Sequence, residues 1–209
     1  MEELINFLNK WQALVGAVIG GVFALWVALL VAYKARRQED LAAAMLLVGN
    51  LVTIRTASRA LKQLAKEKEI EEENLPYWLS EKLVRRRIKL SPLFEASRIR
   101  LMPVNVYLAA HLELFQVIFT DIEAKLDMLS DDIAEFDSSD NIKRKAEILK
   151  ADARVIHQGF EIAVTHAKCA ERILVLKVLS NYPTFHTIRM MLFKTKEEKE
   201  CQKILASKS

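Results

Sequence analysis

The chain begins with an apolar stretch long enough to cross a lipid bilayer. From Trp11 to Tyr33 it reads WQALVGAVIGGVFALWVALLVAY, in which Gln12 is the one strongly polar side chain and no residue is charged. At ~1.5 Å per residue this stretch makes a helix of roughly 34 Å, and the hydrocarbon core of a bilayer is about 30 Å thick. Tryptophan and tyrosine are favoured at the headgroup level, where the two ends would lie. We therefore expect a transmembrane helix at residues 11–33.

Two other interpretations of this stretch are weaker. A cleaved signal peptide has a basic segment followed by ~7–15 apolar residues, whereas Glu2, Glu3 and Lys10 precede a longer stretch here. A buried helix of a soluble protein rarely stays uncharged over such a length and then meets a cluster of arginines.

The charges that flank the stretch predict its orientation. Lys34, Arg36 and Arg37 follow it directly, while Lys10 alone precedes it. An excess of basic residues marks the cytoplasmic side of a span. We expect residues 1–10 to be extracytoplasmic and the rest of the chain after residue 33 to be cytoplasmic, in the inner membrane of a prokaryotic cell.

Small residues recur along the expected span. One row has a spacing of four: Gly16, Gly20, Ala24, Ala28 and Ala32. Small side chains let two helix backbones approach closely in lipid, which predicts a homodimer through this face. Glycine and alanine are also common in any transmembrane helix, and a row spaced by four turns by about 40° at each step, so only part of it can face one partner.

The apolar spacing after the span predicts further helices. One face of residues 41–65 is apolar or small, with Leu47, Leu51, Ile54, Ser58, Leu61 and Ala65. Glycine is the one helix-weakening residue between Trp11 and Asn50, so we expect the span to continue into this helix. Pro76, Pro92 and Pro103 stand where helices start, which predicts short helices near 76–90 and 92–101.

The strongest periodicity consists of two seams with alternating steps of four and three. The first is Leu108, Leu112, Phe115, Phe119, Ile122, Leu126, Leu129, Ile133 and Phe136. The second is Ile142, Ala146, Leu149, Ala153, Ile156, Phe160, Ala163, Ala167, Ala170 and Leu174. The five polar residues 137–141 between them require the two helices to pack antiparallel, as in a coiled coil. Folding about this turn sets Leu108 opposite Ala170 and Phe115 opposite Ala163.

The second of these helices carries a further apolar stripe, made of Ile148, Val155, Ile162, Cys169, Ile173 and Leu176. This stripe needs a cover, and the helix at 41–65 is the candidate. We therefore expect a cytoplasmic three-helix bundle within 34–181. The charged tail at 182–209, after Asn181-Tyr182-Pro183, fits either a last amphipathic helix or an irregular segment.

The composition agrees with an all-α protein. Five glycines and four prolines in 209 residues provide too few turns for a β-sandwich, a β-barrel or a doubly wound sheet. The chain is 52% apolar, and its net charge is +4.

The residues that usually carry chemistry form no recognisable motif. His111, His157, His166 and His186 lack the Glu-x-x-His spacing of a di-iron bundle, and we expect them on the surface or at a second interface. Cys169 lies on the apolar stripe, and we expect it to be a small core residue. Because the two cysteines lie in the part of the chain expected to be cytoplasmic, we expect no disulfide. A glycine-rich phosphate loop and a nucleophile elbow are also lacking. We expect no metal, no cofactor and no enzyme activity.

Charge is unevenly distributed along the chain. The basic stretch from Lys82 to Arg100 has seven basic residues, set against Glu81 and Glu95, and from Asp121 to Asp140 eight acidic residues stand against one lysine. The basic stretch could pair with the acidic helix of the same or a neighbouring subunit, or it could lie on anionic lipid with its aromatic side in the membrane. Nucleic acid is the weakest candidate, because no recognition module surrounds the arginines. We take one set of residues as the surface for a partner or lipid: Trp78, Arg85, Arg86, Arg87 and Lys89.

These patterns predict a single-span, membrane-anchored interaction or scaffold protein that self-associates through its transmembrane helix and binds a protein partner. The alternative is a membrane-active effector or a regulatory subunit of a membrane complex. An unrecognised enzyme is the third hypothesis.

Overall fold

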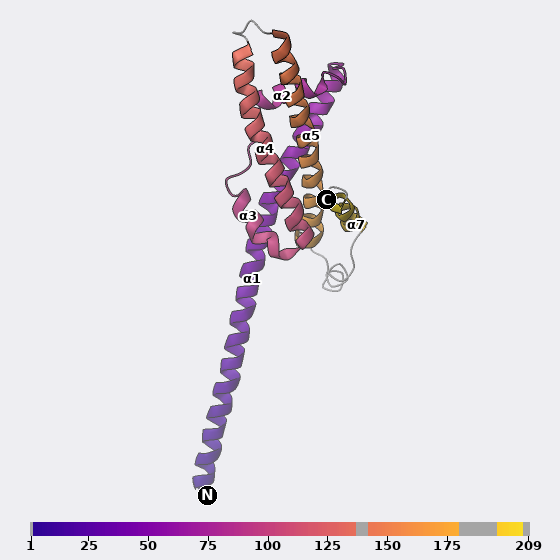
Figure 1. The fold of residues 1–209 in the computed structure, drawn as a ribbon. Coiled ribbons are helices and arrows are strands. Elements are labelled where there is room, and N and C mark those ends of the chain that lie inside the picture. Colours follow the sequence, from indigo (N-terminus) through magenta and orange to yellow (C-terminus); the bar gives the residue numbers. More distant parts are fainter. Residues whose placement is uncertain (1, 137–141, 180–195, 207–209) are drawn as a thin grey trace. The chain divides into compact units, whose positions relative to one another are not determined.

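The computed structural model describes residues 2–136, 142–179 and 196–206. Within these ranges the regular elements are helices and none is a strand (Figure 1). The prediction of an all-helical chain with one long apolar helix near the N-terminus is confirmed there. Contacts divide the chain into two compact units, residues 1–42 and 43–209, and each is described by itself.

The first unit consists of the N-terminal part of helix α1, which spans Glu2–Glu67. This is the one described helix that is long and apolar enough to cross a membrane, and none of its most apolar window is buried. Its large side chains are exposed along the whole stretch, including Trp11, Val18, Phe23, Leu29 and Tyr33. The helix therefore has no hydrophobic stripe covered by its own unit.

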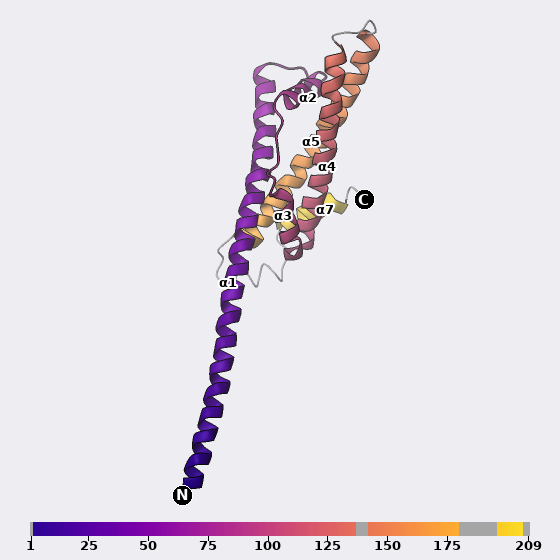
Figure 2. The same ribbon diagram turned by 90° about the vertical axis from the view of Figure 1, so that its left-hand side faces the viewer.

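In the second unit, the remainder of α1 shares one hydrophobic core with α4 (Val106–Phe136) and α5 (Ile142–Leu174). Leu47 and Leu51 of α1, Phe115 of α4 and Ile156 of α5 are fully buried there. Arg55 and Lys62 of α1 pair with Glu171 and Glu161 of α5, respectively. The two helices therefore run in opposite directions, and α4 and α5 lie side by side in both views (Figures 1 and 2).

The helices between α1 and α4 are shorter than the prolines predict. Helix α2 spans Leu75–Arg85 and α3 spans Phe94–Leu101, followed by the short 3-10 helix η1 at Met102–Val104. The prediction of a helix up to residue 90 is wrong. The backbone N–H of Ser91 donates to Asn50 Oδ1 of α1 at 2.8 Å, and the residue before Pro92 is disfavoured in helical geometry. Residues 86–91 are therefore irregular, and this segment is held against α1 by the bond between Ser91 and Asn50.

Helix α5 continues into a π-helix, η2, at Val175–Leu179, and the last described element is α7 at Lys196–Ala206. Part of the charged tail is thus helical, with Cys201 buried. The expected turn at 137–141, the Asn181-Tyr182-Pro183 break and the tail segment at 184–194 lie outside the described residues.

The second apolar stripe of α5 is covered over part of its length. Cys169 and Ile173 are buried, but Ile148 is 51% exposed and Val155 is 47% exposed. The prediction that α1 covers this stripe is therefore wrong for its N-terminal half. Because Lys62 already pairs with Glu161 and α1 ends at Glu67, the helix stops before it reaches these two residues.

Two helical glycines offer a matched test of the α4–α5 contact. A Cβ added at Gly159 of α5 would lie 3.2 Å from Ile122 Cγ1 of α4, whereas a Cβ at Gly49 of α1 would meet nothing within 4 Å. Gly159→Leu should lower the free energy of unfolding by about 1–3 kcal/mol through overpacking. Gly49→Leu should be neutral or stabilising by up to about 1 kcal/mol, because leucine favours helix over glycine. Thermal unfolding followed by circular dichroism measures both; equal effects would contradict this packing.

Candidate functional site

The small-residue face of α1 is open in the structure. A Cβ at Gly16 or at Gly20 would meet nothing within 4 Å, and Ala24 and Ala28 are exposed. The flanking residues Lys34, Arg36 and Arg37 are also exposed, directly after the apolar stretch. The face thus has room for the backbone of a second helix.

The basic surface predicted for a partner or lipid is partly compensated within the chain. Arg85, Arg86, Arg87 and Lys89 are exposed. However, Arg85 pairs with Glu81 at 2.6 Å, and Arg87 pairs with Asp127 of α4. Trp78 is half-buried, and Lys82 Nζ lies 5.6 Å from the centroid of its ring. The Arg87–Asp127 pair corresponds to the expected contact between the basic stretch and the acidic helix of the same chain.

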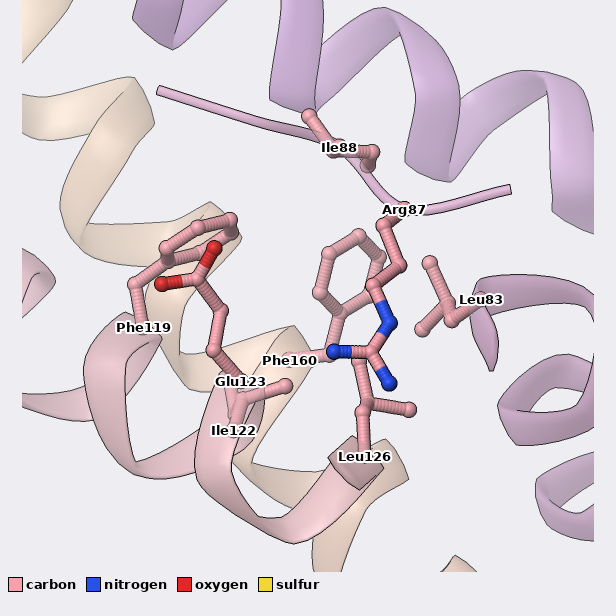
Figure 3. Close-up of a pocket in the computed structure, with 8 residues that line it drawn as sticks. All are labelled: Leu83, Arg87, Ile88, Phe119, Ile122, Glu123, Leu126 and Phe160. Carbon is pink, nitrogen blue, oxygen red and sulfur yellow. The ribbon is translucent and has the colours of Figure 1, made fainter. Parts of the chain in front are cut away.

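A small apolar pocket lies beneath this contact, between α2, α4 and α5 (Figure 3). Its walls are Leu83, Ile88, Phe119, Ile122, Leu126 and Phe160. Arg87 and Glu123 are its two charged members, drawn on opposite sides of the view in Figure 3. Burial raises the pKa of Glu123, while the charges of Arg87 and Lys89 oppose that shift. One carboxyl group and one guanidinium form no nucleophile–base pair, so the pocket gives no catalytic arrangement.

Arg98 belongs to the basic stretch in the sequence but not to its surface. It is 8% exposed, and it bonds both carboxylate oxygens of Glu95 and one of Glu113 on α4. Hydrogen bonds to Glu95 raise the pKa of Arg98, and the same bonds lower the pKa of Glu95. This residue fastens α3 to α4, so it is not available to a partner.

Two histidines meet in the core at the α4–α5 contact. His111 is fully buried and His166 is 1% exposed, so of the two expected places, the surface and a second interface, the surface is wrong for this pair. Their Nδ1 atoms lie 2.9 Å apart, and His111 Nε2 is buried without a hydrogen-bond partner in the part of the chain that the structure describes. Burial, together with the charge of His166, lowers the pKa of His111 to about 4. His157 is half-buried elsewhere on α5, and His186 lies outside the described residues.

Both cysteines lie at the same place. Cys169 of α5 and Cys201 of α7 are buried free thiols, and one nitrogen of His111 and the two Sγ atoms all lie within 4.8 Å of one another. Burial and a hydrogen bond with Cys201 raise the pKa of Cys169 to about 12. The core position expected for Cys169 is observed. The sequence analysis did not predict that these histidines and cysteines meet, because it considered each residue on its own helix. The signal for the two histidines was present: the expected pairing of Leu108 with Ala170 and of Phe115 with Ala163 sets position 111 opposite 166–167.

In comparisons with known proteins, no family model, curated protein or solved structure matches the chain.

Arg98→Met should lower the free energy of unfolding by about 1–3 kcal/mol, because it removes charge-assisted hydrogen bonds to two carboxylates. Arg98 lowers the pKa of Glu95 in the folded state. That contribution is therefore complete above the ordinary carboxyl pKa and is lost as the pH falls through the lowered pKa. The difference between wild type and variant should shrink in acid, as measured by denaturant titration at neutral and acid pH.

Arg85→Met is the matched control for this measurement. Its side chain is 69% exposed in an i,i+4 pair with Glu81, and such exposed pairs contribute about 0.5 kcal/mol or less. Equal losses in the two variants would show that the Arg98 network is not a structural tie.

Proposed function

We propose that the chain is a membrane-anchored helical scaffold that self-associates through residues 16–28 of α1 and presents its C-terminal helices to a protein partner. The observation that carries this proposal is the exposed apolar surface of α1 at residues 11–33, where the most apolar window is 0% buried. A helix that is apolar on all sides needs either a protein core or lipid around it.

Lipid supplies that surrounding without any change in the fold. The stretch has the length of a bilayer core, an aromatic residue at each end and a basic cluster at one end. The basic cluster supports an orientation with the second unit in the cytoplasm of a prokaryotic cell. Self-association rests on the open face around Gly16 and Gly20, since close backbone packing is a main source of helix association in lipid.

The second unit supplies the interaction surface of this scaffold. Arg85 pairs with Glu81 and Arg87 pairs with Asp127. The charge of Lys89 acts on Glu123, whose pKa it lowers. Arg86 is the exposed arginine of this group with no ion pair to a described residue. On the same unit, the uncovered half of the α5 stripe exposes Ile148 and Val155. Exposed arginine and exposed apolar side chains are both found at protein interfaces.

The test is native mass spectrometry of the full-length chain released from nanodiscs. We expect a dimer, and we expect Gly16→Leu and Gly20→Leu each to weaken it at least about tenfold, or about 1.4 kcal/mol, because leucine separates the two backbones.

Val18→Leu and Val22→Leu are the matched controls. They add bulk in the same region, but two residues along a helix is about half a turn, so these side chains point away from the glycine face. They should leave the dimer intact. A monomeric wild type, or an equal effect of all four substitutions, would contradict association through this face.

A further inference from the structure

Three helices of the second unit bring metal-binding side chains to one buried point. His111 comes from α4, Cys169 from α5 and Cys201 from α7, and one donor atom of each lies within 4.8 Å of the others. These side chains are between 0% and 5% exposed. Helix α7 contacts both α4 and α5 and lies beside the start of α4 and the end of α5 (Figure 1).

One nitrogen of the His111 ring is left without a hydrogen bond of good geometry. His111 Nε2 is buried and has no such partner among the described residues, whereas His111 Nδ1 faces His166 Nδ1 at 2.9 Å. An unpaired buried polar atom is costly, so native structures rarely keep one without a function. A ring held through one nitrogen, with the other nitrogen free, is the usual arrangement of a histidine that binds a metal ion.

The chemistry of the donor atoms limits which metal ions the cluster can bind. Two thiolates and one imidazole are soft to borderline ligands, which favour zinc over magnesium or calcium. Zinc takes sulfur at about 2.3 Å and nitrogen at about 2.0–2.1 Å, so its ligand atoms must lie within roughly 4 Å of one another. The three donor atoms are already close to that arrangement.

A bound metal ion would stabilise helix α7 more than the other two helices. Eleven residues form a marginal helix in isolation, and its sequence KEEKECQKILA contains few apolar residues to bury. Arg172 of α5 and Glu200 of α7 lie 3.8 Å apart on the surface next to the two cysteines. A metal bond through Cys201 would hold the helix far more firmly than this exposed ion pair.

We propose that His111 Nε2, Cys169 Sγ and Cys201 Sγ bind one Zn²⁺ ion, and that His166 is a positioning residue that accepts a hydrogen bond from His111 Nδ1–H. Each thiol loses its proton to solvent when it binds, so one Zn²⁺ replaces two protons. A solvent molecule completes the tetrahedron, since three protein ligands leave one position open.

The test is the metal content of the full-length protein, purified under reducing conditions without chelator. We expect about one zinc per chain and a loss of zinc in Cys169→Ser, in Cys201→Ser and in His111→Ala, because three ligands cannot spare one. His157→Ala, a half-buried histidine of α5 outside the cluster, is the control and should keep its zinc. Circular dichroism of each variant shows whether it is folded.

Cobalt provides a second measurement that does not depend on the variants. Added Co²⁺ should give the visible bands of a tetrahedral ion and a thiolate charge-transfer band. Folded, reduced wild-type protein that contains no zinc and shows neither signal would overturn the proposal. Copper in place of zinc would do the same, and so would a Cys169–Cys201 disulfide that persists under reducing conditions.

The role of His166 has its own test, a competition for Zn²⁺ against a chelator. His166→Ala should weaken zinc affinity by about 10–100-fold without abolishing binding, as outer hydrogen-bond partners do. His166→Asn should restore most of that affinity, because the asparagine oxygen can take the place of Nδ1 as acceptor. Complete loss of zinc in both variants would make His166 a ligand and contradict the positioning role.

Discussion

The structure depends on one constraint, the apolar surface of α1 at residues 11–33 that no other part of the described chain covers. Exposure of that surface to water costs roughly 25 cal/mol per Å², so it requires either lipid or a protein partner. We propose that lipid surrounds most of the helix and that a second copy of the chain packs on the glycine face. The proposed location, orientation and oligomeric state all follow from this requirement.

The second unit is held by different forces. Its core is a continuous set of buried aliphatic and aromatic side chains, mainly from α1, α4 and α5, and polar contacts between described residues also link its helices. The ion pair of Arg98 with Glu113 joins α3 to α4, and Asn50 Oδ1 of α1 accepts a hydrogen bond from the backbone N–H of Ser91. Around His111 the polar groups are arranged differently, since a buried nitrogen there has no hydrogen-bond partner among residues 2–136, 142–179 and 196–206. A bound zinc ion would satisfy that nitrogen and would make α7 a fixed part of the fold.

The sequence could predict those elements whose apolar spacing reflects burial. The seam positions from Leu108 to Leu129 and from Leu149 to Leu174 are buried, because a period of about 3.5 residues records which face of a helix is covered. The end of α2 depends instead on a hydrogen bond between distant residues, Asn50 and Ser91, which leaves no periodic signal. Cys201 lies on a short, charged helix without an apolar period, so its contact with His111 could be found only by placing three helices together.

Alkaline carbonate extraction of membranes that contain the full-length chain tests the central claim most directly. We expect the wild type to stay in the membrane pellet. We also expect that a Val22→Lys, Leu25→Lys double variant is released, because each lysine near the centre of a span costs about 2.5–3.5 kcal/mol. Release of the wild-type chain into the supernatant would contradict the account, since its apolar helix would then be covered by protein and not by lipid.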